Sequence, residues 1–163
     1  MRANLSRRKM LRTVLCLVLT IGLAALDQRL KAFAVHSLKG RPGIVLIPGI
    51  LELGYVENKG MAFGLLQGKS LALAVVSLLF VGFAVWLFIV IPSGKKSIPF
   101  LASVILLAAG ALGNMVDRLR LGYVIDFISF CLIRFPLFNL ADCCVVTGAV
   151  SLAVELLFFD REG

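Results

Sequence analysis

Residues 70–91 of the chain read SLALAVVSLLFVGFAVWLFIVI, a run without a charged side chain. A helix needs about 20 mainly apolar residues to cross the hydrocarbon core of a bilayer, and this run is long enough to do so. A second uncharged run follows at residues 98–116, after a short turn. Together they predict two membrane-spanning helices that are joined on one side of the membrane.

Two further apolar segments lie toward the ends of the chain. Residues 11–30 carry charges only near their two ends. In residues 138–159 the only charged side chains are Asp142, near the start, and Glu155, near the end. Charges at the end of a span cost less than charges at its centre, because they can reach headgroups or water. We therefore expect an all-α integral membrane protein. It would be a single domain of residues 1–163 with spans at approximately 11–30, 70–91, 98–117 and 138–159.

The composition agrees with this class. Of the 163 residues 60% are apolar and only 16% are charged, and the mean hydropathy is +1.01. These values exclude a soluble enzyme, a disordered chain, a collagen and a coiled coil. The net charge of +8 would point to nucleic acid in a soluble protein. In a membrane protein the position of the cations explains the charge, so we expect no nucleic-acid partner.

The cations also predict the orientation. Eight of them lie in short segments that share one side of the membrane if there are four spans: Arg2, Arg7, Arg8, Lys9, Arg12, Lys95, Lys96 and Arg161. Cations in short loops close to the membrane mark the cytoplasmic side. Both termini should therefore be cytoplasmic, with two longer loops outside.

The first outer loop should hold a small β-sheet. It is far longer than a connection between helices requires, and residues 43–47 and 51–56 are short β-prone runs between glycines and prolines. Asn58 lies in the last part of this loop, between a strand-like run and a glycine-rich turn. Turn chemistry alone would explain an asparagine at this position.

Acidic and amide side chains gather around the second outer loop. Asp117 and Arg118 could form an ion pair at the end of the third span, and Asn139 with Asp142 is typical of a helix start. Asp126 and Asp142, however, flank one connection whose two ends return to the same membrane surface. Their carboxylates can therefore meet, and two adjacent carboxylates share a proton. Such a pair can hydrolyse a peptide bond, with one group activating water and the other protonating the oxyanion.

Two other classes of protein remain open on the residues alone. A lipid phosphotransferase could use Asp117, Asp126 and Asp142 as Mg²⁺ ligands. A small transporter would need an acid near the bilayer midplane, whereas these acids lie toward the ends of the spans. The chain has one histidine, His36, and no C-x-x-C pair. We therefore expect no metal centre and no other cofactor.

Four blocks of residues resemble, in order, the signature motifs of the lipoprotein signal peptidase (signal peptidase II) family. They are Asp27-Gln28-x-x-Lys31, Asn58-x-Gly60-x-Ala62-Phe63, Gly113-Asn114-x-x-Asp117-Arg118 with Gly122 and Asp126-Phe127, and Phe138-Asn139-x-Ala141-Asp142. The resemblance covers essentially the whole chain.

The resemblance implies an intramembrane aspartic endopeptidase of the bacterial inner membrane, with its active site near the outer face. It would remove signal peptides from prolipoproteins by cutting on the amino side of a diacylglyceryl-modified cysteine. Its partners would be that substrate and membrane lipids, and globomycin-type cyclic peptides would inhibit it. Asp126 and Asp142 would be catalytic, and Asn58, Asn114, Arg118 and Asn139 would line the substrate site. The supporting residues would be Asp27, Lys31, Gly60 and Asp117, the last of which would position Arg118.

Overall fold

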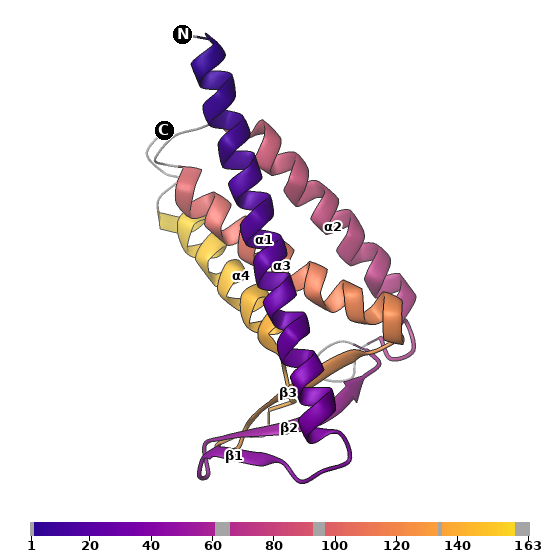
Figure 1. Cartoon of the computed structure of the whole chain (residues 1–163). Helices are drawn as coiled ribbons and strands as arrows, with labels where there is room; N and C mark the ends of the chain where they lie inside the picture. The colour runs from indigo at the N-terminus through magenta and orange to yellow at the C-terminus, as the bar shows by residue number, and fades with distance from the viewer. Residues whose placement is uncertain (1, 61–65, 93–96, 134, 159–163) are drawn as a thin grey trace.

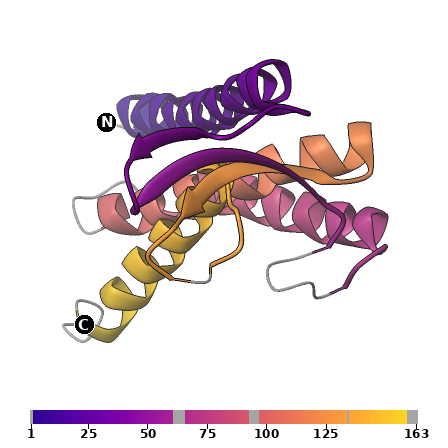
Figure 2. The same cartoon turned by 90° about the horizontal axis from the view of Figure 1, so that it is seen from below.

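The computed structural model describes residues 2–60, 66–92, 97–133 and 135–158. It contains four helices, α1 (Arg2–Leu38), α2 (Ser70–Val90), α3 (Ser97–Leu121) and α4 (Leu140–Phe158). Each contains a stretch long and apolar enough to cross a membrane. Three strands, β1 (Ile44–Ile47), β2 (Leu51–Asn58) and β3 (Val124–Phe130), lie across one end of the helices (Figures 1 and 2). The predicted class of four spans with a small sheet is confirmed.

Some predicted features lie outside the described residues. Lys95, Lys96 and Arg161, which contributed to the orientation, belong to this group. So do Ala62 and Phe63 of the second motif.

Helix α1 is longer than the expected span. Its 37 residues correspond to about 55 Å, against about 30 Å of hydrocarbon. The charges after residue 26 do not end the helix, because Asp27 and Lys31 pair with each other on one buried face. The additional turns are anchored to the sheet, where Ala34 and Leu38 form a buried cluster with two residues of β3, Ile125 and Phe127.

The sheet is antiparallel, in the order β1-β2-β3. Strands β1 and β2 form the hairpin expected from the first outer loop, with Ile44 opposite Leu53. The third strand, which the sequence did not predict, comes from the connection between α3 and α4 and pairs Asp126 with Val56 and Val124 with Asn58. The sheet therefore joins the two long connections between helices and brings Asn58 near Asp126.

Helices α3 and α4 approach each other closely at small residues of α3. A Cβ atom on Gly113 would lie 3.2 Å from Ala141 Cβ, and one on Gly110 would clash with the Ala141 carbonyl and Val145. Helix α3 also packs against α1 and α2, so it forms the centre of the bundle. Helix α3 ends at Leu121, and the next residue, Gly122, has a φ of +80° that is easy only for glycine.

Candidate active site

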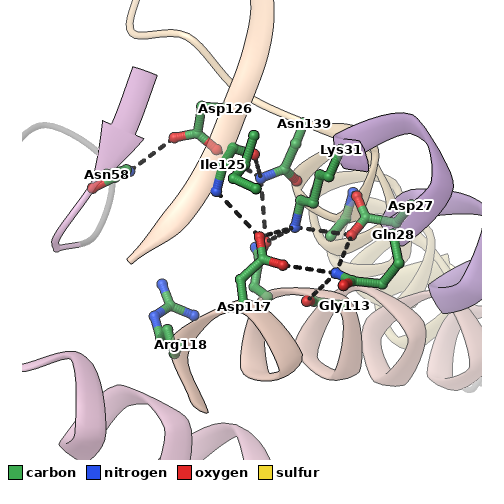
Figure 3. A network of polar contacts seen from close by, with 12 residues as sticks. Asp27, Gln28, Lys31, Asn58, Gly113, Asp117, Arg118, Ile125, Asp126 and Asn139 are labelled. Carbon is green, nitrogen blue, oxygen red and sulfur yellow. Dashed lines mark hydrogen bonds and ion pairs between the residues drawn. The ribbon is translucent and has the colours of Figure 1, made fainter. Parts of the chain in front are cut away.

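Asp126 lies on β3, facing the ends of the helices, and is only 2% exposed. Both of its carboxylate oxygens accept hydrogen bonds from amide side chains. Asn58 Nδ2 donates to Oδ2 at 3.0 Å, and Asn139 Nδ2 donates to Oδ1 at 2.6 Å. The strand pairing and the start of α4 thus hold this carboxylate from two sides (Figure 3).

Asp142 lies in the first turn of α4. Its backbone N–H donates to Asn139 Oδ1 at 2.9 Å, and its Oδ2 accepts from the backbone N–H of Asn139 at 3.2 Å. This reciprocal pair satisfies helix-start donors in the manner of a capping box. The other carboxylate oxygen, Oδ1, accepts from Asn114 Nδ2 at 2.8 Å.

Asn139 contacts both carboxylates, one through its side chain and the other through its backbone. The structure therefore brings Asp126 and Asp142 together at the N-terminal end of α4, as the sequence predicted. Burial raises the pKa of Asp126 from 3.8 to about 6, and the charge of Asp142 adds to the rise. The hydrogen bonds from Asn58 and Asn139 oppose it. A raised pKa on one carboxyl suits a pair in which one group acts as an acid and the other as a base.

The three amides around the pair are oriented by groups that can only donate. Asn58 Oδ1 accepts from the Gly60 N–H at 3.0 Å, and Asn139 Oδ1 accepts from the Asp142 N–H. Asn114 Oδ1 accepts from Lys31 Nζ at 2.8 Å. Each amide must therefore turn its nitrogen toward a carboxylate.

A buried ionic network lies next to the two carboxylates and their amides and supports them (Figure 3). Lys31 Nζ lies 2.8 Å from Asp27 Oδ2 and 3.0 Å from Asp117 Oδ2, with all three side chains at most 3% exposed. Asp27 Oδ1 accepts from the Ala141 N–H at 2.9 Å, and Asp117 Oδ2 accepts from the Ile125 N–H at 3.1 Å. The network therefore ties α1 and α3 to the start of α4 and to β3.

Gln28 belongs to the same network, although it was not predicted as a site residue. Its Nε2 donates to Asp117 Oδ1 at 2.8 Å and to the Gly113 carbonyl at 3.0 Å. Its place beside Asp27 in the first motif was the only sequence signal for it.

Arg118 stands clear of the ionic network (Figure 3). It is partly buried, and its Nη2 donates to the Gly60 carbonyl at 3.3 Å. The contacts of Asp117 within the described ranges go to Gln28, Lys31 and Ile125, so no direct contact there supports the predicted positioning of Arg118.

The three acids considered as Mg²⁺ ligands are not grouped together. The oxygens of Asp117 are instead engaged by Gln28, Lys31 and the Ile125 amide. Among the residues that the structure describes, no cluster of three acidic, histidine or cysteine side chains has the arrangement of a metal site.

The chain is similar in sequence to a known family and to several of its members. The family model described as "Signal peptidase (SPase) II" matches residues 19–158. A lipoprotein signal peptidase of Clostridioides difficile (strain 630) is 39% identical over 91% of this chain and 97% of its own length. One from Streptococcus thermophilus (strain CNRZ 1066) is 34% identical over 94% and 98%.

Two solved structures, both described as bacterial membrane enzymes, share the fold. The first has a TM-score of 0.76 at 26% identity and covers 91% of this chain and 92% of its own. The second has a TM-score of 0.75 at 28% identity and covers 88% and 93%.

Proposed function

The chain belongs to the signal peptidase II family of aspartic peptidases, which remove signal peptides from prolipoproteins, and from this premise we propose that Asp126 and Asp142 are its catalytic pair. The observation that carries the proposal is the contact of Asn139 with both carboxylates. Membership in a peptidase family sets aside the phosphotransferase and transporter alternatives.

The proposed reaction uses one proton shared by the pair. The ionised carboxylate takes a proton from water while the hydroxyl oxygen bonds to the scissile carbonyl carbon. The protonated carboxyl gives its proton to the developing oxyanion, which yields a tetrahedral diol. Collapse of the diol breaks the C–N bond, and the nitrogen leaves as an amine after taking up a proton from the pair. Arg118 would bind the substrate backbone beside the reacting carbonyl, while the amides of Asn58, Asn114 and Asn139 line the site and hold the two carboxylates in place.

The proposed substrate carries a diacylglyceryl group on the cysteine that follows the cleaved bond. Its signal peptide would lie among the helices while the acyl chains remain in lipid, so the scissile bond would reach the pair at the outer end of α4. Globomycin-type cyclic peptides would inhibit the enzyme by occupying the same site. Both proposals rest on the family.

We place the protein in the bacterial inner membrane with both termini in the cytoplasm. The cations of the first twelve residues support this orientation. The start of α1 and the end of α4 lie at the end of the bundle opposite the sheet (Figure 1). The active site would therefore face outward.

The substrate proposal is tested with purified enzyme in detergent and two forms of one prolipoprotein, lipidated and unlipidated. We expect mass spectrometry to show cleavage before the modified cysteine in the lipidated form only. Addition of a chelator should not change the rate. Equal cleavage of both forms would overturn the lipid requirement, and cleavage of neither form would overturn the proposed function.

A further inference from the structure

We propose that Lys31 is a positioning residue whose ammonium group fixes the orientation of the Asn114 amide, so that this amide donates to Asp142. The inference rests on the proposed function, since it concerns the same carboxylate pair. It assigns a specific task to a lysine that otherwise serves only as an ion-pair partner.

The contacts form a continuous path from α1 to α4. Lys31 Nζ donates to Asn114 Oδ1 at 2.8 Å, and Asn114 Nδ2 donates to Asp142 Oδ1 at 2.8 Å. Lys31 is 1% exposed, and Asn114 is 8% exposed. Water therefore cannot easily replace either contact.

An amide has nearly the same shape in its two orientations, so packing alone does not distinguish them. The other two amides of the site are oriented by backbone N–H groups, those of Gly60 and Asp142. Asn114 instead depends on a side chain. Asn139 Nδ2 also reaches Asn114 Oδ1, but at 3.2 Å, and it shares its hydrogens with Asp126 and the Ile125 carbonyl.

Loss of the ammonium would allow the Asn114 amide to flip. Its oxygen would then face Asp142 Oδ1, which would replace a hydrogen bond with repulsion between lone pairs. A hydrogen bond to a charged group contributes enough to change a rate by about 10- to 100-fold.

Lys31 also acts on the pair through its charge. It lowers the pKa of Asp126, against the effect of burial. The charged groups around Lys31 and the pair come from four elements, α1, α3, β3 and α4, and are Asp27, Asp117, Arg118, Asp126 and Asp142. Removal of the lysine charge should therefore raise the pKa of Asp126 and move the limb of the kcat pH profile that depends on Asp126 to higher pH.

The test is Lys31→Met in the full-length purified enzyme, with kcat, KM, the pH profile and the melting temperature measured on the lipidated substrate. The matched variant is Asp27→Asn, which weakens the ion pair of Lys31 but leaves its contact with Asn114. Lys39→Met is the surface control, because Lys39 forms an exposed ion pair with Glu57 at 2.8 Å.

We expect Lys31→Met to lower kcat by about 10- to 100-fold and to change KM by less than about threefold. The limb of the kcat pH profile that depends on Asp126 should move to higher pH. Asp27→Asn should lower the melting temperature as Lys31→Met does, but it should lower kcat much less, because Lys31 keeps its contact with Asn114. Lys39→Met should behave as wild type. If Lys31→Met fails to fold, Lys31→Met with Asp117→Asn restores the net charge of the network, and it should show the same loss of kcat.

Parallel losses of kcat and melting temperature in Lys31→Met and Asp27→Asn would show a merely structural role and overturn the inference. So would wild-type kcat in the double variant. If Lys31→Met turns over normally while a separate Asp126→Asn variant is inactive, the role of Lys31 is overturned and the catalytic pair is not. Activity in Asp126→Asn would instead overturn the pair.

Discussion

The carboxyl group of Asp126 is buried, and hydrogen bonds from two amide nitrogens offset only part of the free energy needed to bury its charge. Burial raises its pKa from 3.8 to about 6. Between these two values the folded protein binds the proton more tightly than the unfolded chain. The contribution of Asp126 to stability is therefore fully present below about pH 4, and it is lost as the pH rises through 6.

This linkage predicts how melting temperature depends on pH. The melting temperature of the wild type, relative to Asp126→Asn, should fall as the pH is raised from about 4 to 7, because only the wild type titrates at this position. Melting curves of both proteins in the same detergent test this. A difference that does not vary with pH would contradict the raised pKa.

Asn139 has two tasks that substitutions can separate. Asn139→Ala removes both the helix cap and the contact with Asp126, so it should cost about 1 kcal/mol or more of stability and most of the activity. Serine also caps helices but has no amide nitrogen to reach Asp126. Asn139→Ser should therefore recover stability without recovering kcat, as melting curves and cleavage rates would show. Recovery of both would mean that Asn139 serves only as a cap.

The proximity of Asp126 and Asp142 could be predicted from the sequence, because they flank one connection whose two ends return to the same membrane surface. The hydrogen bonds around them could not. The orientation of Asn114 depends on Lys31, which lies on a different helix. Gln28 remained without a role for the same reason, since its partners, Gly113 and Asp117, belong to α3.

At the scale of elements, the site depends on how closely α3 approaches α1 and α4. A Cβ atom on Gly113 would lie 2.7 Å from Asp27 Oδ2 and 3.2 Å from Ala141 Cβ. Only glycine therefore allows Asp27 to reach the start of α4 past this helix.

Gly113→Ala should lower stability by about 1–3 kcal/mol and reduce cleavage, because the added methyl group displaces Asp27. Gly22→Ala is the matched control on α1, since a Cβ atom there meets nothing within 4 Å. It should be neutral or slightly stabilising. Equal melting temperatures for the two variants would contradict the close approach.

Apolar runs predicted the helices, but they did not predict where α1 ends or that β3 exists. Helix α1 continues beyond Asp27 and Lys31 because these charges neutralise each other inside the protein. Strand β3 pairs with β2, which is distant in the sequence, and Asp126 interrupts its apolar pattern. Both features result from tertiary contacts that a local pattern does not contain.

At the scale of the whole molecule, the native cysteines provide a test of orientation. Cys131 is exposed in the connection between β3 and α4, whereas Cys16 and Cys144 are buried and Cys143 is partly buried. An impermeant maleimide should label Cys131 in spheroplasts, and Cys131→Ser should remove the label. In that background Lys9→Cys should react only in inverted vesicles. The reverse pattern would place the site in the cytoplasm.

The central claim is that Asp126 and Asp142 carry out the cleavage together. It is tested most directly by the turnover of lipidated prolipoprotein by purified Asp126→Asn and Asp142→Asn, with Glu52→Gln as a control for the loss of an acid in the sheet. Both aspartate variants should insert and fold, but lose activity by about a thousandfold or more, while the control cleaves normally. Cleavage at the wild-type rate by either aspartate variant would contradict the account.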